Sequence, residues 1–467
     1  MRCGLFTFVQ TKWISHCRSS MVFRVYLLTL LLILCAVQKT ETVSINDLNE
    51  IKDGVKFAET MTTAMKPLEF TEFLASAASK ALPFISATLK FVNLIFSHIG
   101  NSESPELLQI KRLYNEMNRR FDIVDNELLD IKKLINWTRV SNQFSKIERE
   151  ITTVSIQFKI IYDGPLAIRK SEKSYFMNAF ESTCLNCALD LYHGIMGVNK
   201  GLSDDILQTA MTSLQYDRPK TQMFMLGIFK LLLLGLNNEL AYRKLKFGNA
   251  DYLFIKKQWE SRLTNVTEKM KRIDEAVKIK YHDQAEKDIA RISMQNLRSV
   301  RSNHNFSEYL YDHLVQKYDW RDWLVVVYRP IWGVQNHVNH ICDGYRRYGM
   351  YERDVLVASV DQSKDPINTT IADAITKGIT TTHTTWTSGT CHTTGNYDIC
   401  SPGFWTTNKR NALEVYNLIP SETRDCNMYS SMGVIDSWVD LWYQGKSERL
   451  VHHRTPGSNS YSIHLFG

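Results

Sequence analysis

The chain has 467 residues, 44% of them hydrophobic, so it is too long for a single core and suggests two or three units. The formal charge falls from +7 to +3 without residues 1–42, which hold five Lys/Arg and one Asp/Glu, so no basic excess calls for a nucleic-acid partner. The sequence also lacks a phosphate loop, a dinucleotide fingerprint, a nucleophile elbow, a zinc-protease helix and an EF-hand loop. We therefore expect no enzyme activity, no catalytic residue, no cofactor and no metal site.

Residues 1–42 have the pattern of a secretory signal region. Arg18 and Arg24 precede an apolar run from Val25 to Val37, which is followed by polar residues. The run is too short to span a bilayer and has the length of a signal-peptide core, although a membrane anchor is the alternative. Translation can start at Met1 or at Met21. We predict a secreted, extracellular protein from which this region is removed.

Secretion predicts what the remaining cysteines and certain asparagines do. In an oxidising compartment an even number of cysteines indicates disulfides, and six thiols allow 15 connectivities, among which the sequence does not choose. The six are Cys184, Cys187, Cys342, Cys391, Cys400 and Cys426. Asn-x-Ser/Thr sequons predict N-glycosylation. They lie at Asn136, Asn265, Asn305 and Asn368.

Residues 46–99 are predicted to form short helices, the last of which begins at Pro83. From residue 81 to residue 99 the only charged side chain is Lys90. A helix that is apolar on nearly all sides is buried either in protein or in a membrane, and its length here is marginal for a span. A core helix is the more common case. The membrane-insertion candidates in this segment are Leu82, Phe84, Phe91 and Phe96.

Two long segments carry heptad repeats. From Leu107 to Ile135 apolar residues recur at alternating steps of three and four, and the pattern resumes after a slip from Val140 to Ile161. A second stripe begins at Trp259 within residues 251–300. We predict that helices near 105–162 and 251–300 pack antiparallel along these faces, with dimerisation through each face as the alternative.

Between the two heptad segments, residues 166–247 form a second helical group. Its centre runs from Met223 to Leu236, where Lys230 is the only charged residue. This length favours a core helix, but its place between the long helices is where a connecting hairpin would lie, so Met223 and Leu236 are also membrane-insertion candidates. Cys184 and Cys187 lie in an amphipathic stretch without the strand that a redox motif needs, so we expect a structural role, bridged to each other or to the C-terminal region.

The composition changes at residue 318. Seven of the ten tryptophans follow this point, and an apolar run from Leu324 to Tyr328 predicts a buried strand. Ten of the residues from 376 to 394 are threonine, which favours strands. Cys391 and Cys400 flank the turn pair Gly395-Asn396, which indicates a bridged hairpin.

Histidines are frequent in this last region. His337 and His340 would lie on one face of a helix, and His383, His392, His452 and His453 lie in the same region. A zinc site needs more ligands at a fixed geometry, so scattered histidines do not predict one. The tryptophans can form a surface for sugars or lipid headgroups, but core packing is their more frequent use.

Several segments resemble the cephalotoxin-like proteins and the related rapunzel-like proteins. They are Ala81-Leu-Pro-Phe-Ile85, Asn118-Arg-Arg-Phe-Asp122 within the heptads, Tyr318-Asp-Trp-Arg-Asp-Trp-Leu324 with Val325-Val-Val-Tyr328, and His340-Ile-Cys342. The resemblance covers most of the chain after the leader, and its Trp-rich segment is the most distinctive part. It implies a secreted toxin-like protein and supplies no catalytic motif.

Taken together, the patterns predict a mainly α fold: an elongated bundle with two long antiparallel heptad helices over residues 43–317, and a smaller disulfide-braced α+β head over residues 318–467. One hypothesis is a toxin that acts on membranes through a concealed apolar helix. The alternative is a non-enzymatic extracellular matrix or interaction protein, for example in a mineralised skeleton, although a charge of +3 does not suit acidic mineral nucleation. Membrane lipid or matrix components are the expected partners, nucleic acid is not, and an oligomer is compatible with the heptads.

Overall fold

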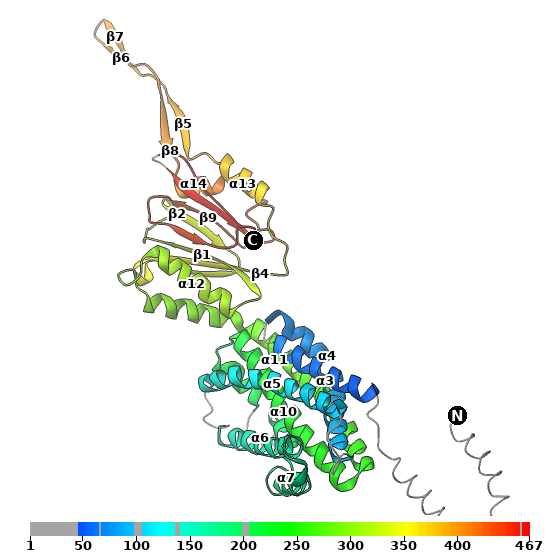
Figure 1. The fold of residues 1–467 in the computed structure, drawn as a ribbon. Coiled ribbons are helices and arrows are strands. Elements are labelled where there is room, and N and C mark those ends of the chain that lie inside the picture. The colour runs from blue at the N-terminus through cyan, green and yellow to red at the C-terminus, as the bar shows by residue number, and fades with distance from the viewer. Residues whose placement is uncertain (1–44, 65–66, 98–104, 136–140, 199–204, 458–459) are drawn as a thin grey trace, which may run out of the picture.

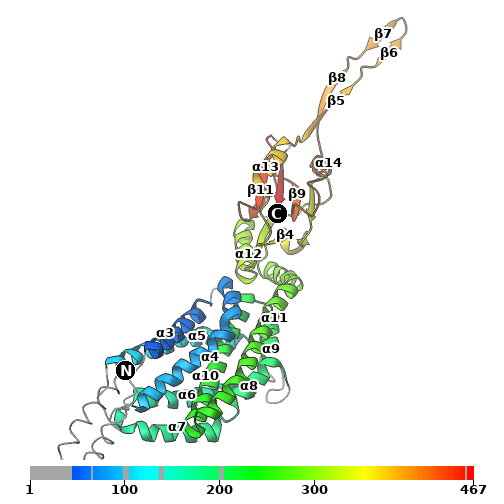
Figure 2. The same ribbon diagram turned by 90° about the vertical axis from the view of Figure 1, so that its right-hand side faces the viewer.

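The computed structural model describes residues 45–64, 67–97, 105–135, 141–198, 205–457 and 460–467. The molecule is elongated, with a helical body at one end and a head built around β-sheets at the other (Figures 1 and 2). A narrow β-ribbon projects from the head on the side away from the body (Figure 2). The predicted class, mainly α with a β-containing C-terminal region, is confirmed.

The helical body is organised around one central helix, α10. Helix α10 packs against α4, α5 and α6 on some sides and against α7, α8, α9 and α11 on others. Because neighbours surround it, α10 has no polar face, as expected of a helix in the middle of a core. The helices of the body are α3 (Ile45–Thr63), α4 (Pro67–Ser97), α5 (Pro105–Leu134), α6 (Ser141–Asp163), α7 (Arg169–Thr183), α8 (Cys187–Met196), α9 (Ile206–Ser213), α10 (Arg218–Phe247) and α11 (Asn249–Gln295), with a 3-10 turn at Leu166–Ile168.

The heptad faces are buried, but they do not face each other. Phe121 of α5 is 3% exposed, and Leu263 of α11 is fully buried. Helix α5 packs on α3 and α10, whereas α11 packs on α10 and α4. The prediction that segments 105–162 and 251–300 pack directly on each other is therefore wrong. Helix α10, which is apolar on all sides, lies between them. The first segment is also two helices, α5 and α6, rather than one long element.

The N-terminal helices are longer than predicted. Two long helices, α3 and α4, replace the expected series of short ones, and Pro83 lies inside α4 instead of opening a helix. A proline inside a helix cannot donate a hydrogen bond to the preceding turn, and its ring disturbs that turn. Pro83 is on the solvent side of α4. There water can satisfy the freed carbonyl group, so the helix continues.

The head has four layers. Sheet A has the strand order β10-β1-β4-β3 and sheet B the order β11-β12-β9-β2, and every pairing is antiparallel. Helix α12 covers one outer face, and α13 and α14 cover the other. The elements are α12 (Asn303–Lys317), β1 (Arg321–Tyr328), β2 (His337–Ile341), β3 (Gly344–Arg347), β4 (Asp354–Asp361), α13 (Thr369–Gly378), α14 (Ala412–Asn417), β9 (Ser431–Asp436), β10 (Trp442–Gln444), β11 (Leu450–Arg454) and β12 (Tyr461–Phe466), with a 3-10 turn at Met350–Glu352.

Strand β1 is buried on both faces, as its unbroken apolar sequence predicts. Trp323 and Val325 join the apolar cluster that continues into the helical body, whereas Leu324 and Val326 pack between the two sheets. A strand covered on both faces needs no alternation of apolar and polar residues. The core of the body and the core of the head therefore meet at β1.

Helix α11 extends far enough to contact the head. Near its C-terminal end, Asp288 accepts hydrogen bonds from Lys317 at 2.5 Å and from the Tyr318 hydroxyl at 2.8 Å. Burial alone would raise the pKa of the Asp288 carboxyl, but the hydrogen bond and charge of Lys317, together with the hydrogen bonds from Tyr318 and Gln284, lower it. This contact fixes α11 to the residues that lead into β1.

The ribbon is made of two antiparallel pairs in series. Strands β5 (Thr382–Thr387) and β8 (Phe404–Lys409) form its base, and β6 (Cys391–Thr394) and β7 (Tyr397–Cys400) form its tip. The hairpin predicted around Gly395-Asn396 is confirmed, with Gly395 at a φ of 65° in the turn. Glycine adopts this left-handed conformation without the steric cost of a Cβ.

Candidate functional site

Helix α10 is defined at both ends by its own sequence. The Asp217 side chain caps the N-terminus by accepting a 3.1 Å hydrogen bond from the Lys220 backbone N–H, and Pro219 lies in the first turn. The helix ends at Gly248, whose φ is 89°. A residue without a Cβ suits this position because the chain must turn sharply into α11. The helix therefore starts and stops independently of its neighbours.

The middle of α10 is strongly apolar from Met223 to Leu236, with Lys230 as its one charge. Within the residues that the structure describes, α10 is the one helix long and apolar enough to cross a membrane, and 83% of its most apolar window is buried. Leu236 is fully buried, and Met223 is partly buried. A core helix of a soluble protein has the same composition, so length and apolarity alone do not distinguish the two.

Two glycines bring neighbouring helices close to α10. A Cβ on Gly227 would lie 2.3 Å from the nearest methyl of Leu128 in α5. A Cβ on Gly235 would lie 3.1 Å from Ile151 of α6 and 3.4 Å from the Cβ of Ala188 in α8. Glycine weakens a helix by about 1 kcal/mol relative to alanine, and close packing offsets this cost. Small residues serve the same purpose between helices in membranes.

Lys230 places one buried charge at the centre of α10. Its side chain is 3% exposed, and its ammonium donates a 3.0 Å hydrogen bond to the Phe121 carbonyl and pairs with Asp125. Burial lowers the pKa of Lys230, and the nearby Asp125 carboxylate opposes this shift. Asp125 itself is 57% exposed, so the carboxylate end of the pair reaches water.

A groove opens beside this pair. Its volume is about 390 Å³, and it lies between α5, α6 and α10. Asp125, Lys132 and Glu148 line its polar side, whereas Leu231 and Leu234 of α10 line its apolar side. The groove therefore exposes part of the otherwise covered helix.

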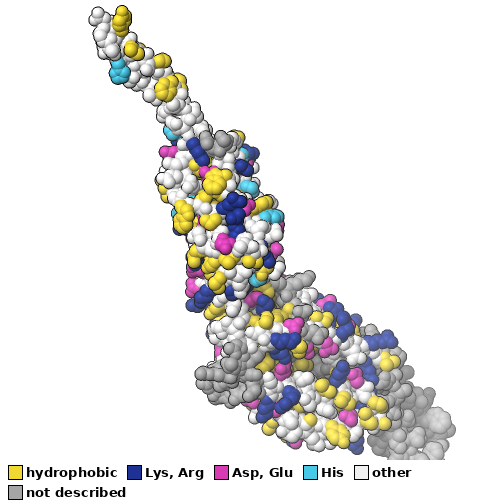
Figure 3. Space-filling model, turned by 90° about the vertical axis from the view of Figure 1, so that its left-hand side faces the viewer, with side chains coloured by type: hydrophobic (Ala, Val, Ile, Leu, Met, Phe, Trp, Pro, Cys, Tyr) yellow, Lys and Arg dark blue, Asp and Glu magenta, His cyan; other side chains and the backbone are white. Residues whose placement is uncertain are grey.

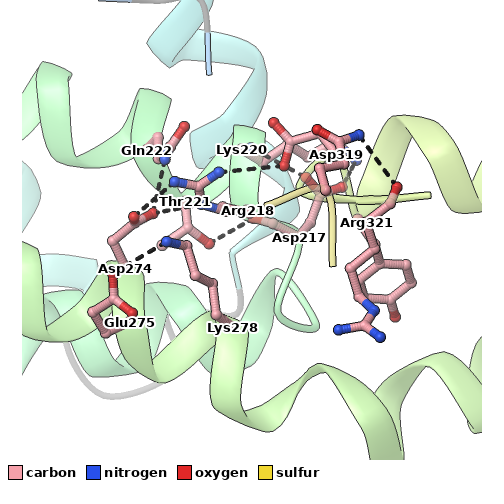
Figure 4. Close-up of polar contacts among 12 residues, drawn as sticks. Asp217, Arg218, Lys220, Thr221, Gln222, Asp274, Glu275, Lys278, Asp319 and Arg321 are labelled. Carbon is pink, nitrogen blue, oxygen red and sulfur yellow. Dashed lines mark hydrogen bonds and ion pairs between the residues drawn. The ribbon is translucent and has the colours of Figure 1, made fainter. Parts of the chain in front are cut away.

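The N-terminus of α10 is held by a buried ion cluster (Figure 4). Arg218 forms two hydrogen bonds of 2.9 Å with the Asp274 carboxylate of α11. Gln222 donates a further bond of 2.7 Å to Asp274. The two charged side chains are 7% and 5% exposed. Two parallel bonds between planar groups fix the orientation of α10 against α11.

The same arginine reaches the start of the head. The Arg218 guanidinium lies 3.6 Å from the Asp319 carboxylate and 5.6 Å from the centre of the Trp320 ring. Burial raises the pKa of Asp319, and the charge of Arg218 opposes this shift. Burial also works against the charge of Arg218, but Asp274 and Asp319 together outweigh it and raise the arginine pKa. Arg218 thus links α10, α11 and the entry to β1.

The comparison with known families bears on this helical body. Residues 100–298 match the family model of the cephalotoxin-like middle helical domain. This part of the chain is therefore similar to the cephalotoxin-like middle helical domain. The predicted cephalotoxin-like resemblance is thereby confirmed. No curated protein and no solved structure matches the chain significantly.

The matched segment contains the site described above. The matched region spans α5 to α11 and includes Lys230, Arg218 and Asp274, whereas α3, α4 and the head lie outside the match. The Trp-rich segment from Tyr318 to Tyr328, which carried much of the resemblance in the sequence, lies in the head. The rapunzel-like part of the resemblance stays a prediction.

The other predicted membrane segment, residues 81–99, has weaker support. Leu82 and Phe84 are 6% and 5% exposed and belong to the core, and Lys90 pairs with Glu50 at 2.7 Å. The side chains of Phe91 and Phe96 lie outside the described residues. Helix α4 is not among the described helices that meet the criteria for a membrane span.

The six cysteines form three disulfides: Cys184–Cys187, Cys342–Cys426 and Cys391–Cys400. The last of these closes the tip of the ribbon, and Cys342–Cys426 connects the end of β2 to the loop before β9. Among the described residues, His340, Cys342 and Cys426 also bring three potential metal ligands together. The disulfide occupies both sulfurs, so the group offers only one imidazole.

The predicted glycosylation residues differ in their surroundings. Asn305 and Asn368 are exposed, whereas Asn265 is half-buried in α11, where its amide donates a 3.4 Å hydrogen bond to Tyr192. Asn136 lies outside the described residues. The predicted pairing of His337 and His340 on one helical face is wrong, because β2 is a strand: His337 is buried and His340 is exposed.

Sequence reasoning missed the residues that hold α10. Arg218 and Asp274 are 56 positions apart, and no local pattern connects them. A signal was available for Lys230, which is the only charge in a long apolar run and therefore needs a partner inside the fold.

Proposed function

We propose that this is a secreted toxin-like protein that acts on membranes by releasing α10 from the helical body. The observation that carries the proposal is α10 itself, a helix of sufficient length and apolarity to span a bilayer that is enclosed by the other helices of the body. The cephalotoxin-like domain that contains it and the disulfides are consistent with an extracellular toxin-like protein. The proposal involves no catalytic step.

The charges of α10 suit a spanning segment with one costly residue. Arg218 lies at one end and Lys244 and Lys246 at the other, where long cationic side chains can reach the headgroups. Between these ends, Lys230 lies at the centre of the apolar stretch and would enter the hydrocarbon at a cost of about 2.5–3.5 kcal/mol on insertion scales, whereas Lys220, Glu239 and Arg243 lie nearer the ends of the helix. In the folded protein, the ion pair with Asp125 and the hydrogen bond to the Phe121 carbonyl compensate for the burial of the Lys230 charge.

The leading test compares dye leakage from phosphatidylcholine vesicles for the wild type and Lys230→Met. Removing the central charge favours insertion, so we expect faster leakage. The soluble fold should tolerate the change, because the Asp125 carboxylate that loses its partner is 57% exposed and stays hydrated. Lys246→Met is the matched control, since Lys246 lies in the last turn and should not alter leakage. Equal melting temperatures of the three proteins would show that the fold is unchanged.

A disulfide lock tests whether α10 must move. Cysteines at Gly235 and Ala188 would have their Cβ atoms about 3.4 Å apart, close to the separation in natural disulfides, and would tie α10 to α8. Cysteines at Gly54 and Ala87, 3.6 Å apart by the same measure, would tie α3 to α4 and serve as a control lock. Mass spectrometry would verify both new bonds and the native Cys184–Cys187 bond.

We expect the α10 lock to abolish leakage and the control lock to leave it unchanged. Leakage that persists with the α10 lock in place would contradict release of α10. Absence of leakage from the wild type would overturn the membrane proposal altogether.

The second candidate is a non-enzymatic extracellular matrix or interaction protein. It is favoured by the burial of 83% of the apolar window of α10 and by the buried Arg218–Asp274 contact, both of which are expected of a permanent core helix. In that case no vesicle leakage occurs, and the function belongs to the exposed surfaces of the head.

A further inference from the structure

The ribbon of residues 382–409, here called the arm, extends away from the head without support from other elements. Its strands pair only with each other in the described sheets, and its tip lies at the end of the molecule opposite the helical body (Figures 1 and 2). A two-stranded ribbon is marginally stable by itself. An arm of this kind is therefore expected to have a use that depends on its reach.

Large apolar side chains are exposed along the arm. Tyr397 is 79% exposed, Trp405 67%, Ile399 63%, Phe404 56% and Trp386 52%. Hydrophobic side chains are visible on the surface of the arm up to its tip (Figure 3). Single exposed apolar residues are ordinary, but five on one narrow ribbon mark a surface that is covered when the protein acts.

These side chains are held in fixed positions. Trp386 and Trp405 lie directly opposite each other, with their ring centres 5.1 Å apart. Gly403 makes room for Trp386, since a Cβ there would lie 2.2 Å from the indole ring. The Thr385 and Thr406 hydroxyls bond across the strands at 2.9 Å. Because the arm is already ordered, binding through these rings would require little further loss of conformational entropy.

The tip has one apolar face and one polar face. Tyr397 and Ile399 alternate along β7 and therefore point to the same side, next to their cross-strand partners Thr394 and His392. Asp398 points to the other side, where it accepts a 2.7 Å hydrogen bond from the Thr393 hydroxyl. The tip can thus present an apolar side to a surface and keep its one carboxylate in water.

The charge of the arm limits the kind of surface. Between Lys377 and Lys409 the sequence contains no Lys or Arg, and Asp398 is the only acidic residue. An anionic partner such as nucleic acid, a sulfated sugar or an acidic lipid would find no lysine or arginine along the arm except Lys409 at its base, which pairs with Asp436 of the head. Tryptophan and tyrosine, with an apolar ring and a polar tip, concentrate at the boundary between lipid headgroups and hydrocarbon.

We propose that the arm binds electrically neutral, phosphatidylcholine-type membranes by placing Tyr397, Ile399 and the paired tryptophans in the interfacial layer. The binding site is separate from α10 and does not require that any helix leaves the body. It goes beyond the proposed function, and it stands even if α10 never enters a membrane.

The test measures partition of the full protein onto phosphatidylcholine vesicles by co-sedimentation. The arm variant combines Tyr397→Asp with Ile399→Asp, which places two carboxylates on the apolar face of the tip. The matched control combines Tyr175→Asp with Ile279→Asp, because those residues are 63% and 75% exposed on α7 and α11. We expect the arm variant to bind the vesicles at least about tenfold more weakly than the wild type. The control variant should bind like the wild type. All four positions are exposed, so the melting temperatures should be alike.

Several outcomes would overturn the proposal. They are equal binding by the arm variant and the wild type, and absence of binding by the wild type. Binding of a neutral oligosaccharide that the arm variant loses, without vesicle binding, would assign the arm to sugars. A dimer in sedimentation velocity that the arm variant dissociates would assign it to a second copy of the chain.

The α8–α10 disulfide lock separates this inference from the proposed function. A locked protein that binds vesicles but causes no leakage supports both. Normal leakage from the arm variant at saturating lipid, together with weak partition, supports the arm as the binding site. Loss of leakage in Lys230→Met with unchanged partition would contradict membrane insertion of α10 and leave membrane binding by the arm intact.

Discussion

Arg218 of α10 and Asp274 of α11 form two hydrogen bonds of 2.9 Å between side chains that are 7% and 5% exposed. We predict that Arg218→Met lowers the free energy of unfolding by about 3–5 kcal/mol, because the substitution leaves the Asp274 carboxylate buried without its counter-charge. Urea denaturation at neutral pH measures this change.

The double variant Arg218→Met/Asp274→Leu is the control for that prediction. Replacing a buried ion pair by apolar residues of similar volume is often close to neutral, so we expect the double variant to recover most of the loss. A double variant that is as unstable as the sum of the two single variants would show that the pair does not act as a unit.

The close approach of α5 and α10 at Gly227 gives a second prediction. Gly227→Ala should cost about 1–3 kcal/mol despite the better helix propensity of alanine, because its methyl would overlap the Leu128 side chain. Adding Leu128→Ala should make the Gly227 substitution nearly neutral. Stability measured for the four proteins of this cycle checks the contact, and an equal effect of Gly227→Ala in both backgrounds would refute it.

The sequence predicted which faces are buried better than it predicted what covers them. The heptad steps through Phe121 and Leu263 identify core positions because the period of a helix is visible locally. The partner of each face depends on α10, which is apolar on all sides and therefore gives no directional signal. The periodicity consequently identified core faces on α5 and α11 but assigned them to each other.

Long-range pairing limited the prediction in the head as well. The strand at Leu324–Tyr328 was predictable from its β-branched run, and the hairpin at Gly395-Asn396 from its turn residues. The stretch from His337 to His340 is too short to distinguish a helix from a strand by its sequence. It is a strand because it pairs with β9, which lies nearly a hundred residues later in the chain. The exposure of the arm had no signal at all, since threonine and tryptophan occur equally in covered sheets.

Glycosylation provides a third prediction. In protein secreted from a eukaryotic cell, Asn305 and Asn368 should carry glycans, whereas Asn265 should not, because it is half-buried against Tyr192. At Asn368 the side-chain oxygen caps α13 by accepting a 3.1 Å hydrogen bond from the Ile371 N–H. A glycan attaches to the amide nitrogen and leaves this cap intact. Peptide mapping after enzymatic deglycosylation checks all three positions, and a fully occupied Asn265 would contradict the placement of α11.

The last prediction concerns His464, which is fully buried within the head beside Gly433, with its Nε2 3.1 Å from the Ser431 hydroxyl. Burial lowers the pKa of His464 to about 3, with His452 adding to the shift. In the unfolded chain a histidine titrates near pH 6.5. The folded state therefore binds fewer protons than the unfolded state between these values, so stability is complete above pH 6.5 and falls as the pH drops toward 3.

By this linkage we expect His464 to remove roughly 2–3 kcal/mol of stability between pH 7.5 and pH 4.5. His464→Gln keeps a polar group that can hydrogen-bond without titrating. Its free energy of unfolding should therefore fall by roughly 2–3 kcal/mol less than that of the wild type over the same pH range. Urea denaturation of both proteins at the two pH values measures the difference. Asp288 and Asp322 do not interfere, because their lowered pKa values place their losses below pH 3.8. His337 and His452, whose pKa values burial also lowers, are present in both proteins and cancel. An identical pH dependence of the two proteins would mean that His464 is not kept neutral by burial in the head.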